Sequence, residues 1–304
     1  MENNYSKNLM KLNQDYLQLY YSSSYQKHLN KKIRKLSIKD MLFQIYTGYF
    51  YHRIKSMFFL DNKKYYPTCS NNGKVNLENQ RIAVYTVIIG DYDDLKEPLF
   101  YSENCDYYVI TDKLNIDEES IWKKIMIADY INVEEFSNTE IARYVKTHPH
   151  IFFKEYSYSL FIDGNFLIVA DIMPLFSGFS SKFLGLHIHP SNECIYKEGN
   201  DVIALRKSNL TDVKTQLNYY RKQGFPKNYG LFETNIMIRK HNDKECIKIM
   251  EEWWNQMKQY TKRDQLSLTY VLWKLGYSFN DIYILGNNPR LNPRFRYLSH
   301  KNVN

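Results

Sequence analysis

The sequence of 304 residues predicts an α/β domain with a mostly parallel central sheet flanked by helices, preceded by a helical extension. Three features predict this architecture. Apolar runs such as "RIAVYTVIIG" are nearly continuous, as in strands that are covered on both faces. Helical patterns alternate with these runs, which indicates crossover connections and a parallel sheet. A basic stretch at the N-terminus stands apart from this alternation.

The chain is expected to divide into a basic helical extension (residues 1–66), a linker (67–80) and the main domain (81–304). Residues 1–64 hold 12 Lys/Arg and 4 Asp/Glu, whereas the remainder holds 29 of each sign. The net charge of +8 therefore belongs to the extension. Aromatic and aliphatic residues beside this basic cluster suit a helix on an anionic membrane surface. Packing of the extension on the body or on another subunit is the alternative.

Composition narrows the class of protein. Apolar residues make up 44% and charged residues 24%, as in a soluble globular protein. Because the main domain is neutral, no nucleic-acid partner is expected. The four cysteines are far apart, so we expect reduced thiols and no zinc knuckle. The opening is too polar for a signal peptide, and no stretch reaches the roughly 18 apolar residues of a spanning helix. A cytoplasmic protein is expected, peripheral on the inner face of the membrane if the extension binds lipid.

The elements of the main domain follow in order. Strands are expected at residues 81–90, 105–112, 158–163, 182–190 and 231–240. Helices are expected at residues 137–148, 211–224, 244–260 and 264–276. Ser137 or Asn138 begins the first helix and Pro149 follows it, while Thr211 is the expected cap of the second and Gly224 its end.

Three acidic residues stand at expected strand ends, namely Asp91, Asp112 and Asp163. Ligands of such sheets bind beyond the carboxyl ends of the strands. Neither G-x-G-x-x-G nor a P-loop is present, which disfavours a dinucleotide dehydrogenase and a P-loop NTPase. A diphosphate bound here would need a cation, and the oxygens of Asp163 and Asn165 suit Mg²⁺ or Mn²⁺. Gly164 would let both side chains face one ion, although Asp-Gly is also an ordinary turn.

Several separated motifs occur in a fixed order: "YTVIIGDYD", "CDYYVITD", "ARYVKTHPHIFF", "YSLFIDGNFLI", "LGLHIHPSNECIYKEG", "QLNYYRKQGFP", "GLFETNIMIRKHN" and "KRDQLSL". Together they resemble the glycosyltransferase-like domain family of unknown function shared by plant mucilage and pectin-related Golgi proteins and by bacterial polysaccharide enzymes. The resemblance covers roughly Arg81 to Gly276. It implies a GT-A-like (Rossmann-like) fold, a nucleotide-sugar donor and a divalent cation on an Asp-x-Asp motif. The "DGN" element departs from that motif at Asn165, which is neutral.

The donor site that the resemblance implies lies in the first half of the main domain. Its nucleobase and ribose contacts would be Thr86, Gly90, Asp91, Tyr92 and Asp112. Arg143 and Lys146 are three residues apart, so both can face one side of their helix. There they would point at the diphosphate or at Asp163. A solvated helix face is the alternative for these two residues.

The candidates for catalysis are Asp163, His187, His189, Glu233, Asn235, Asp264 and Gln265. His187 and His189 alternate on a strand and so are expected to face one side, where they could bind a metal, phosphate or acceptor hydroxyls. Two satisfied structural histidines are the alternative. Glu198, expected in a Gly-bounded loop, would join His189 at the acceptor.

The last candidates lie toward the C-terminus. Asp264 and Gln265 open a helix, where Asp264 could simply be a cap. The resemblance instead implies that this Asp-Gln pair faces the transferred sugar, as in retaining GT-A enzymes, because carboxylates stabilise an oxocarbenium-like centre. His300, within "NNPRLNPRFRYLSHK", is a candidate metal ligand together with Asp163 and Asn165. A solvated basic tail is the alternative for this segment.

We therefore expect a glycosyltransferase that moves a hexosyl or glycuronosyl group from a UDP-sugar to a hydroxyl of a glycan or lipid-linked glycan. Retention of configuration is expected by analogy, and a bacterial capsule, lipopolysaccharide or wall glycan is the expected pathway. Two other classes stay open. One is a metal-dependent hydrolase that uses His187, His189 and Asp163. The other is a non-catalytic nucleotide- or glycan-binding module, which the neutral Asn165 permits.

Overall fold

The computed structural model describes residues 3–18, 37–46, 77, 80–113, 115–179 and 181–301. Its strands are β1 (Ile82–Ile88), β2 (Cys105–Thr111), β3 (Lys123–Met126), β4 (Tyr158–Ile162), β5 (Phe166–Ile168), β6 (Leu184–Ile188), β7 (Phe232–Arg239), β8 (Tyr283–Gly286) and β9 (Phe295–Tyr297). Its helices include one over residues 4–18, α2 (Ile38–Tyr46), α4 (Asn138–Thr147), α5 (Pro149–Phe152), α6 (Ile195–Ala204), α7 (Leu210–Lys222), α8 (Lys244–Gln259) and α9 (Leu268–Lys274). Short 3-10 helices include η3 (Met173–Phe176), η4 (Asp264–Leu266) and η6 (Pro289–Leu291).

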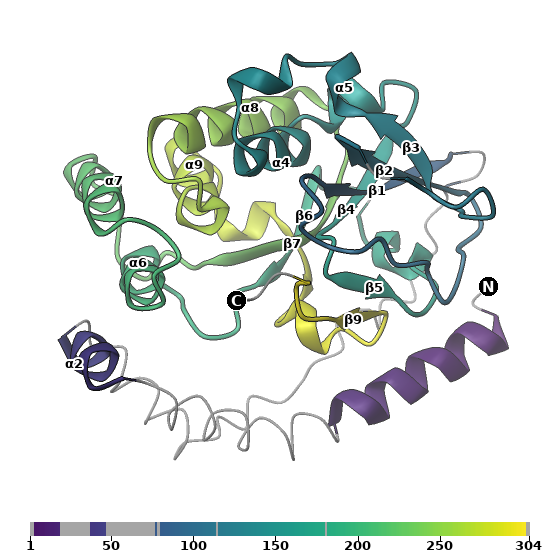
Figure 1. Cartoon of the computed structure of the whole chain (residues 1–304), viewed down its shortest axis with the longest axis horizontal. Helices are drawn as coiled ribbons and strands as arrows, with labels where there is room; N and C mark the ends of the chain where they lie inside the picture. Colours follow the sequence, from purple (N-terminus) through teal and green to yellow (C-terminus); the bar gives the residue numbers. More distant parts are fainter. Residues whose placement is uncertain are drawn as a thin grey trace.

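The central sheet has seven strands in the order β3-β2-β1-β4-β7-β6-β8 (Figure 1). All neighbouring pairs are parallel except those of β7, which runs antiparallel to both β4 and β6. The expected mostly parallel sheet flanked by helices is therefore confirmed. Because β7 is reversed, its amino end meets the carboxyl ends of β4 and β6 at one edge of the sheet.

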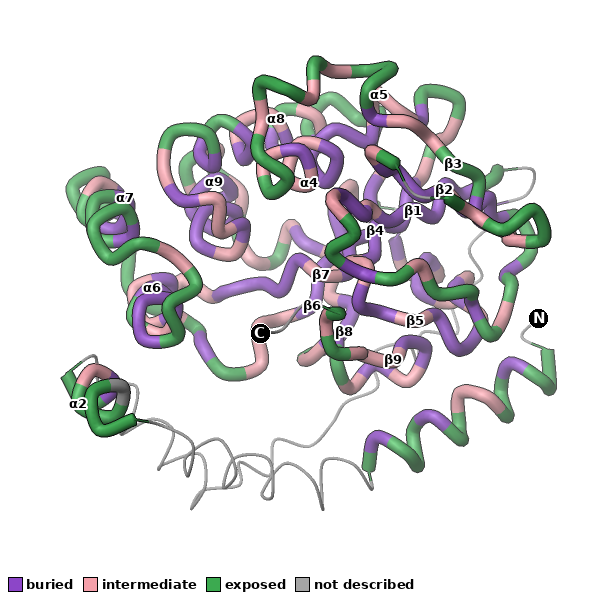
Figure 2. Tube along the Cα trace, viewed as in Figure 1, coloured by how far each residue is buried: buried purple, intermediate pink, exposed green. Residues whose placement is uncertain are grey.

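Two apolar cores lie on the two faces of the sheet. In β1 the side chains alternate: Ala83 and Tyr85 face one core, while Ile82 and Val84 face the other. Helices α4, α8 and α9 cover the first core (Figure 1). Residues of β5, η3 and β9 contribute to the second. The strands β1, β2, β4 and β7 are buried on both faces, as Figure 2 shows, which explains their near-continuous apolar sequences.

The helix over residues 4–18 packs on the main domain. Its Ser6, Asn13 and Leu17 are buried. The Asn13 amide donates to the backbone oxygens of Pro293 at 3.0 Å and Phe295 at 2.9 Å. This helix of the N-terminal extension therefore packs on the body, which was the alternative to membrane binding. Residues 19–36 and 47–76, which include most of the expected linker, lie outside the described residues.

Several elements differ from the expectation, which included none of the strands β3, β5, β8 and β9. β3 is short and carries exposed lysines at the edge of the sheet, so its sequence lacks the apolar run of a central strand. α6 replaces the expected loop around Glu198. Gly199 reads as a loop residue, but a Cβ there would lie 2.3 Å from Leu217, so this glycine permits close contact between α6 and α7. α7 begins one residue earlier than expected, with Asn209 in place of Thr211 as its cap. In the described part of the chain, no helix has the length and apolar character to span a membrane.

Candidate active site

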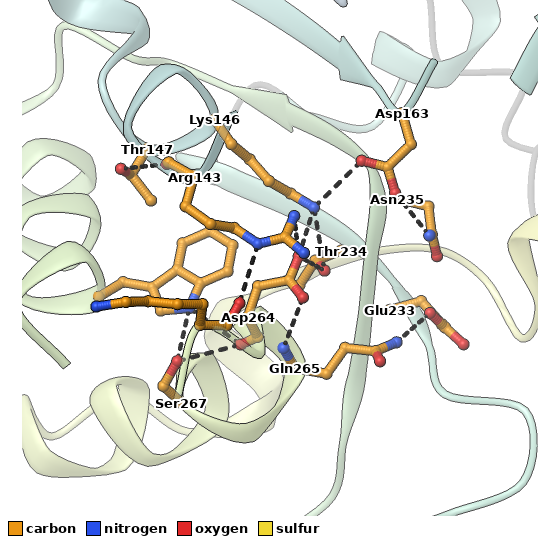
Figure 3. A network of polar contacts seen from close by, with 12 residues as sticks. Arg143, Lys146, Thr147, Asp163, Glu233, Thr234, Asn235, Asp264, Gln265 and Ser267 are labelled. Carbon is orange, nitrogen blue, oxygen red and sulfur yellow. Dashed lines mark hydrogen bonds and ion pairs between the residues drawn. The ribbon is translucent and has the colours of Figure 1, made fainter. Parts of the chain in front are cut away.

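Helix α4 brings two cations to the carboxyl edge of the sheet. It begins with a capping box, in which Ser137 Oγ accepts from the Glu140 N–H and the Glu140 carboxylate accepts from the Ser137 N–H. Arg143 and Lys146 lie on the same side of this helix (Figure 3). The Lys146 side chain is only 1% exposed and that of Arg143 is 18% exposed. Arg143 and Lys146 therefore do not lie on a solvated helix face.

The Lys146 ammonium lies between two carboxylates. Its Nζ donates to Asp264 Oδ2 at 2.6 Å and lies 3.4 Å from Asp163 Oδ1. A third acceptor, Thr234 Oγ1, lies 3.3 Å away. An ammonium has three N–H donors, so these contacts satisfy all of them. The expected proximity of Lys146 to Asp163 is present, and Asp264 from the far end of the chain joins them (Figure 3).

Asp264 is the anionic centre of this network. Its Oδ2 also accepts from Thr234 Oγ1 at 2.9 Å and pairs with Arg143 Nη1 at 3.3 Å. Burial alone would raise the pKa of Asp264, but Arg143, Lys146 and Arg263 outweigh it and hold the pKa well below its usual range. Asp264 is the first residue of η4, which has no side-chain cap. The carboxylate is thus ionised and bound to other elements, and a simple capping role does not describe it.

Asp163 follows β4 at the carboxyl edge of the sheet. Its N–H donates to the Asn235 backbone oxygen at 2.8 Å, and its Oδ2 accepts from Asn235 Nδ2 at 2.8 Å. The Phe166 N–H donates to the Asp163 backbone oxygen at 3.0 Å, which closes the turn. A Cβ at Gly164 would lie 3.3 Å from Asp93 Oδ2, so the glycine lets this turn approach a second carboxylate. Each carboxylate oxygen of Asp163 therefore has a partner, Lys146 or Asn235.

A second polar group surrounds Glu233, at the amino end of β7. Gln265 Nε2 donates to Glu233 Oε2, as Figure 3 shows. His189 Nε2 lies 3.6 Å from Glu233 Oε1 and 3.4 Å from Glu198 Oε2. Burial raises the pKa of Glu233 to about 7, although Arg290 opposes the shift. Burial also raises the pKa of Glu198. Glu233 is thus poised to exchange a proton near neutral pH, and burial shifts the pKa of Glu198 in the same direction.

The tautomer of His189 follows from its neighbours. Its Nδ1 accepts from the backbone N–H of Asn192 at 2.9 Å and of Ser191 at 3.3 Å. The ring proton therefore lies on Nε2, where it faces Glu198 and Glu233. Burial lowers the pKa of His189 to about 4, so the ring is neutral at pH 7. The Asn192 side chain in turn donates to Glu198 Oε2 at 2.6 Å. The predicted neighbours His189 and Glu198 are thus brought together.

His187 has different surroundings from His189. It is fully buried, its Nε2 lies 3.1 Å from Asn292 Nδ2, and burial lowers its pKa to about 3. Among the described residues His187 and His189 share no polar partner, so the expected pairing on one side does not produce a joint site there. Within the described ranges, no three His, Cys, Asp or Glu residues are arranged to hold a metal ion. The ligand set His187, His189 and Asp163 of a metal-dependent hydrolase is therefore not supported.

The third residue of the DGN element contacts the C-terminal segment. Asn165 Nδ2 lies 3.1 Å from His300 Nε2, and His300 Nδ1 lies 2.9 Å from Asp93 Oδ2. A carboxylate beside Nδ1 favours a proton there, which leaves the Nε2 lone pair facing Asn165. Asn165 Oδ1 is buried and has no hydrogen-bond partner among the described residues. The Asn165 amide therefore donates to His300 Nε2, and its Oδ1 is the oxygen of this group that could face a cation. Asp163 and His300 are the other candidate ligands.

The candidate nucleobase and ribose contacts lie on β1, in the loop after β1 and directly after β2. The Gly90 N–H donates to Asp112 Oδ1 at 3.0 Å, and Gly90 has a φ of +65°. A Cβ there would lie 2.2 Å from Asn138 Nδ2, so glycine is required. The remaining members of this set differ in exposure: Thr86 is buried in β1, Asp91 is exposed and pairs with Lys113, and the exposed Tyr92 ring lies 4.9 Å from that of His300.

Sequence reasoning missed several residues of the site. Thr234 joins the ammonium network, Asn192 orients Glu198, and Asp93 orients His300. The sequence contained a signal for two of these residues, Thr234 and Asp93. Thr234 stands between Glu233 and Asn235, and Asp93 belongs to the same acidic loop as Asp91. Nothing in the sequence pointed to Asn192, whose role depends on the turn after β6.

The fold and the site define an α/β protein with a network of charged side chains at the carboxyl edge of its sheet. A family profile described as "TOD1/MUCI70, glycosyltransferase-like domain" matches residues 58–285. The chain therefore belongs to this family, and the resemblance inferred from its motifs is confirmed.

Structural comparison gives one further similarity. The apo structure of WbbM, a bifunctional glycosyltransferase, matches 70% of this chain and 40% of the WbbM chain, with 12% sequence identity and a TM-score of 0.39. The chain thus corresponds to less than half of WbbM. No curated protein sequence matches this chain.

Proposed function

We propose that this protein transfers a sugar from a nucleotide-sugar donor, UDP-linked, to a hydroxyl of a glycan or lipid-linked glycan in surface polysaccharide synthesis. Membership of a glycosyltransferase-like family supports the class. The observation that carries the proposal is the buried Lys146 between Asp163 and Asp264, beside the Glu233–Gln265 pair. This arrangement puts fixed charges of both signs at the edge of the sheet where ligands of α/β proteins bind.

The departing diphosphate needs positive charge around it. Arg143 and Lys146 already neutralise the two carboxylates of the network, so further cations are required. Arg263 is a candidate, because it acts on the pKa of Asp264 and its buried Nε has no hydrogen-bond partner in the part of the chain that the structure describes. A Mn²⁺ or Mg²⁺ ion held by Asp163, Asn165 and His300 would supply additional charge to the leaving group.

The transfer breaks the bond between the anomeric carbon and a diphosphate oxygen, and the acceptor oxygen forms the new bond. The bonding electrons leave with the diphosphate, which also takes the acceptor's proton. In this scheme Asp264 stabilises the positive charge that develops on the sugar, because it is ionised and preorganised by its partners. Glu233 and Gln265 hold sugar hydroxyls, and Glu198 with His189 holds the acceptor. Retention of configuration is proposed by analogy with GT-A enzymes that have a similar Asp-Gln element.

The first test of this proposal is a thermal-stability screen of the protein with a panel of nucleotide sugars, with and without Mn²⁺. A ligand that binds only the folded state must raise the melting temperature. The stabilising donor is then incubated with glycan acceptors, and the products are analysed for a new glycosidic bond and its anomeric configuration. Release of free sugar to water alone would indicate a hydrolase. Stabilisation without any turnover would indicate a binding module.

Dependence on a cation is tested on the same reaction. Exhaustive metal removal with EDTA should suppress transfer, and Mn²⁺ or Mg²⁺ should restore it. Full activity after metal removal would assign the neutralisation of the diphosphate to arginine and lysine side chains alone.

A further inference from the structure

Helix α2 carries an exposed apolar stripe. Ile38, Met41, Leu42, Ile45 and Tyr46 are large apolar residues that are 36% to 78% exposed. Their spacing is i, i+3, i+4, i+7 and i+8, so at about 100° per residue they share one face of the helix. The stripe spans an arc of about 140° on that wheel. An exposed apolar face of this kind marks an interaction site in a soluble protein.

The opposite face of α2 contacts the main domain. Gln44 is buried, and Phe43 is partly buried against the core that α4, α8 and α9 cover. The guanidinium of Arg206, just after α6, lies over the Phe43 ring at 5.9 Å. Because α2 contacts the body through one face, the exposed apolar stripe lies on its other face. Figure 2 shows that most of α2 is exposed. The orientation of the stripe is thus set by packing that the helix already makes.

The basic residues beside α2 in the sequence indicate the chemistry of the surface that its apolar stripe would bind. The segment that precedes it in the sequence, "KHLNKKIRKLS", contains five Lys/Arg and no acidic residue. Lys39, on α2 itself, is exposed beside the stripe. An amphipathic helix with an apolar face and adjacent basic residues binds an interface that is apolar beneath and anionic at its surface. A second protein copy would not match, because it would carry the same positive charge.

We infer that α2 is a membrane-docking helix whose stripe of Ile38, Met41, Leu42, Ile45 and Tyr46 inserts into the surface of an anionic lipid bilayer. The neighbouring basic residues contact the lipid headgroups. The helix over residues 4–18 is packed on the domain through Asn13 and Leu17. This inference concerns attachment to a surface and is independent of the proposed transfer reaction.

Vesicle binding by the full chain tests the inference. The probes are vesicles of phosphatidylcholine alone and of phosphatidylcholine with phosphatidylglycerol, at low and high salt. The variant Leu42→Glu/Ile45→Glu places charges in the centre of the stripe. The matched control is Leu99→Glu/Leu210→Glu, which alters two leucines of the main domain that are 46% and 39% exposed. Size-exclusion chromatography with light scattering gives the oligomeric state of each variant.

The native chain and the control should bind the anionic vesicles, and binding should weaken at high salt because headgroup contacts are screened. The stripe variant should bind at least about tenfold more weakly, since each buried leucine side chain contributes about that factor or more. Equal binding by the stripe variant, or no binding by the native chain, would overturn the inference. A native dimer that the stripe variant converts to a monomer, without vesicle binding, would also overturn it and make the stripe an interface between copies.

A loss of folding in the stripe variant is detected by circular dichroism. In that case Leu42→Ser/Ile45→Ser, which adds no charge, replaces it in the same comparison. Weaker binding of the serine variant at unchanged melting temperature supports the docking role, and unchanged binding rejects it.

Discussion

Replacing Asp264 with asparagine removes one charge from a buried ion pair. In the native protein Lys146 Nζ and Asp264 Oδ2 are 2.6 Å apart, and their side chains are 1% and 6% exposed. Asparagine keeps the shape but leaves the buried ammonium with Asp163, at 3.4 Å, as its remaining carboxylate. Removal of one partner from a buried pair costs about 3–5 kcal/mol. Because Asp163 and Thr234 remain, we expect Asp264→Asn to lower the free energy of unfolding by about 3 kcal/mol.

A double-mutant cycle with Lys146→Met isolates the pair. Lys146→Met alone should cost a similar amount, since Asp264 would lose its closest cation and keep Arg143 and Arg263. The double variant leaves neither charge unpaired, so it should lose about 2 kcal/mol less than the sum of the single variants. The assay is urea denaturation followed by far-UV circular dichroism, with the slopes compared to confirm a common unfolded state. Additivity within about 0.5 kcal/mol would show that the two charges are not coupled and would refute this account of the site.

The same variant also bears on the reaction. At temperatures where Asp264→Asn is folded, kcat should fall much more than donor affinity, because the carboxylate acts on charge that develops only in the transition state. Donor dissociation constants come from titration and kcat from product formation. Unchanged kcat would leave Asp264 as a structural counter-charge for Lys146.

Four further outcomes follow from the structure. Asp163→Ala should abolish transfer while its circular dichroism spectrum stays native, because this residue lies at a strand end; near-normal turnover would exclude it from the donor site. The pKa of His189 is about 4 in the folded chain against 6.5 in an unfolded one, so stability should fall by up to ~3 kcal/mol as the pH drops through that window, and less in His189→Gln. Glu233 has a pKa of about 7, so kcat/KM should change near neutral pH, and a Glu233→Gln variant with the same profile would contradict its role. Gly90→Ala should lower stability by about 1–3 kcal/mol, because φ is +65° and the added Cβ meets Asn138; an unchanged melting temperature would count against that strain.

The architecture could be predicted wherever one physical signal dominates. The apolar runs of β1, β2 and β4 determine their burial, and the capping box at Ser137 determines where α4 begins. β3 was not predicted because an edge strand needs few apolar residues. α6 was not predicted because Gly199 was interpreted as a loop residue, whereas it allows α6 and α7 to approach closely.

Most residues of the candidate site could be predicted from the sequence, but the contacts between them could not. Strand-end position pointed to Asp163, and helical spacing pointed to Arg143 and Lys146. That Asp264 pairs with Lys146 could not be read from sequence, because it requires η4 to reach the end of α4. The family resemblance had linked Asp264 to the sugar, whereas its closest observed partner is an ammonium.

Strand β7 runs antiparallel to β4, and residues from the first and second halves of the chain meet where these two strands pair. Lys146 and Asp264 are 118 residues apart in sequence, and Asn165 and His300 are 135 apart. During synthesis, Lys146 and Asp163 emerge long before their partners, so a nascent chain holds an incomplete set of charges. Binding competence would therefore arise only after Asp264 and His300 have been synthesised, and no N-terminal fragment that stops before Asp264 would possess it. Donor binding would then report the completion of folding for the whole domain.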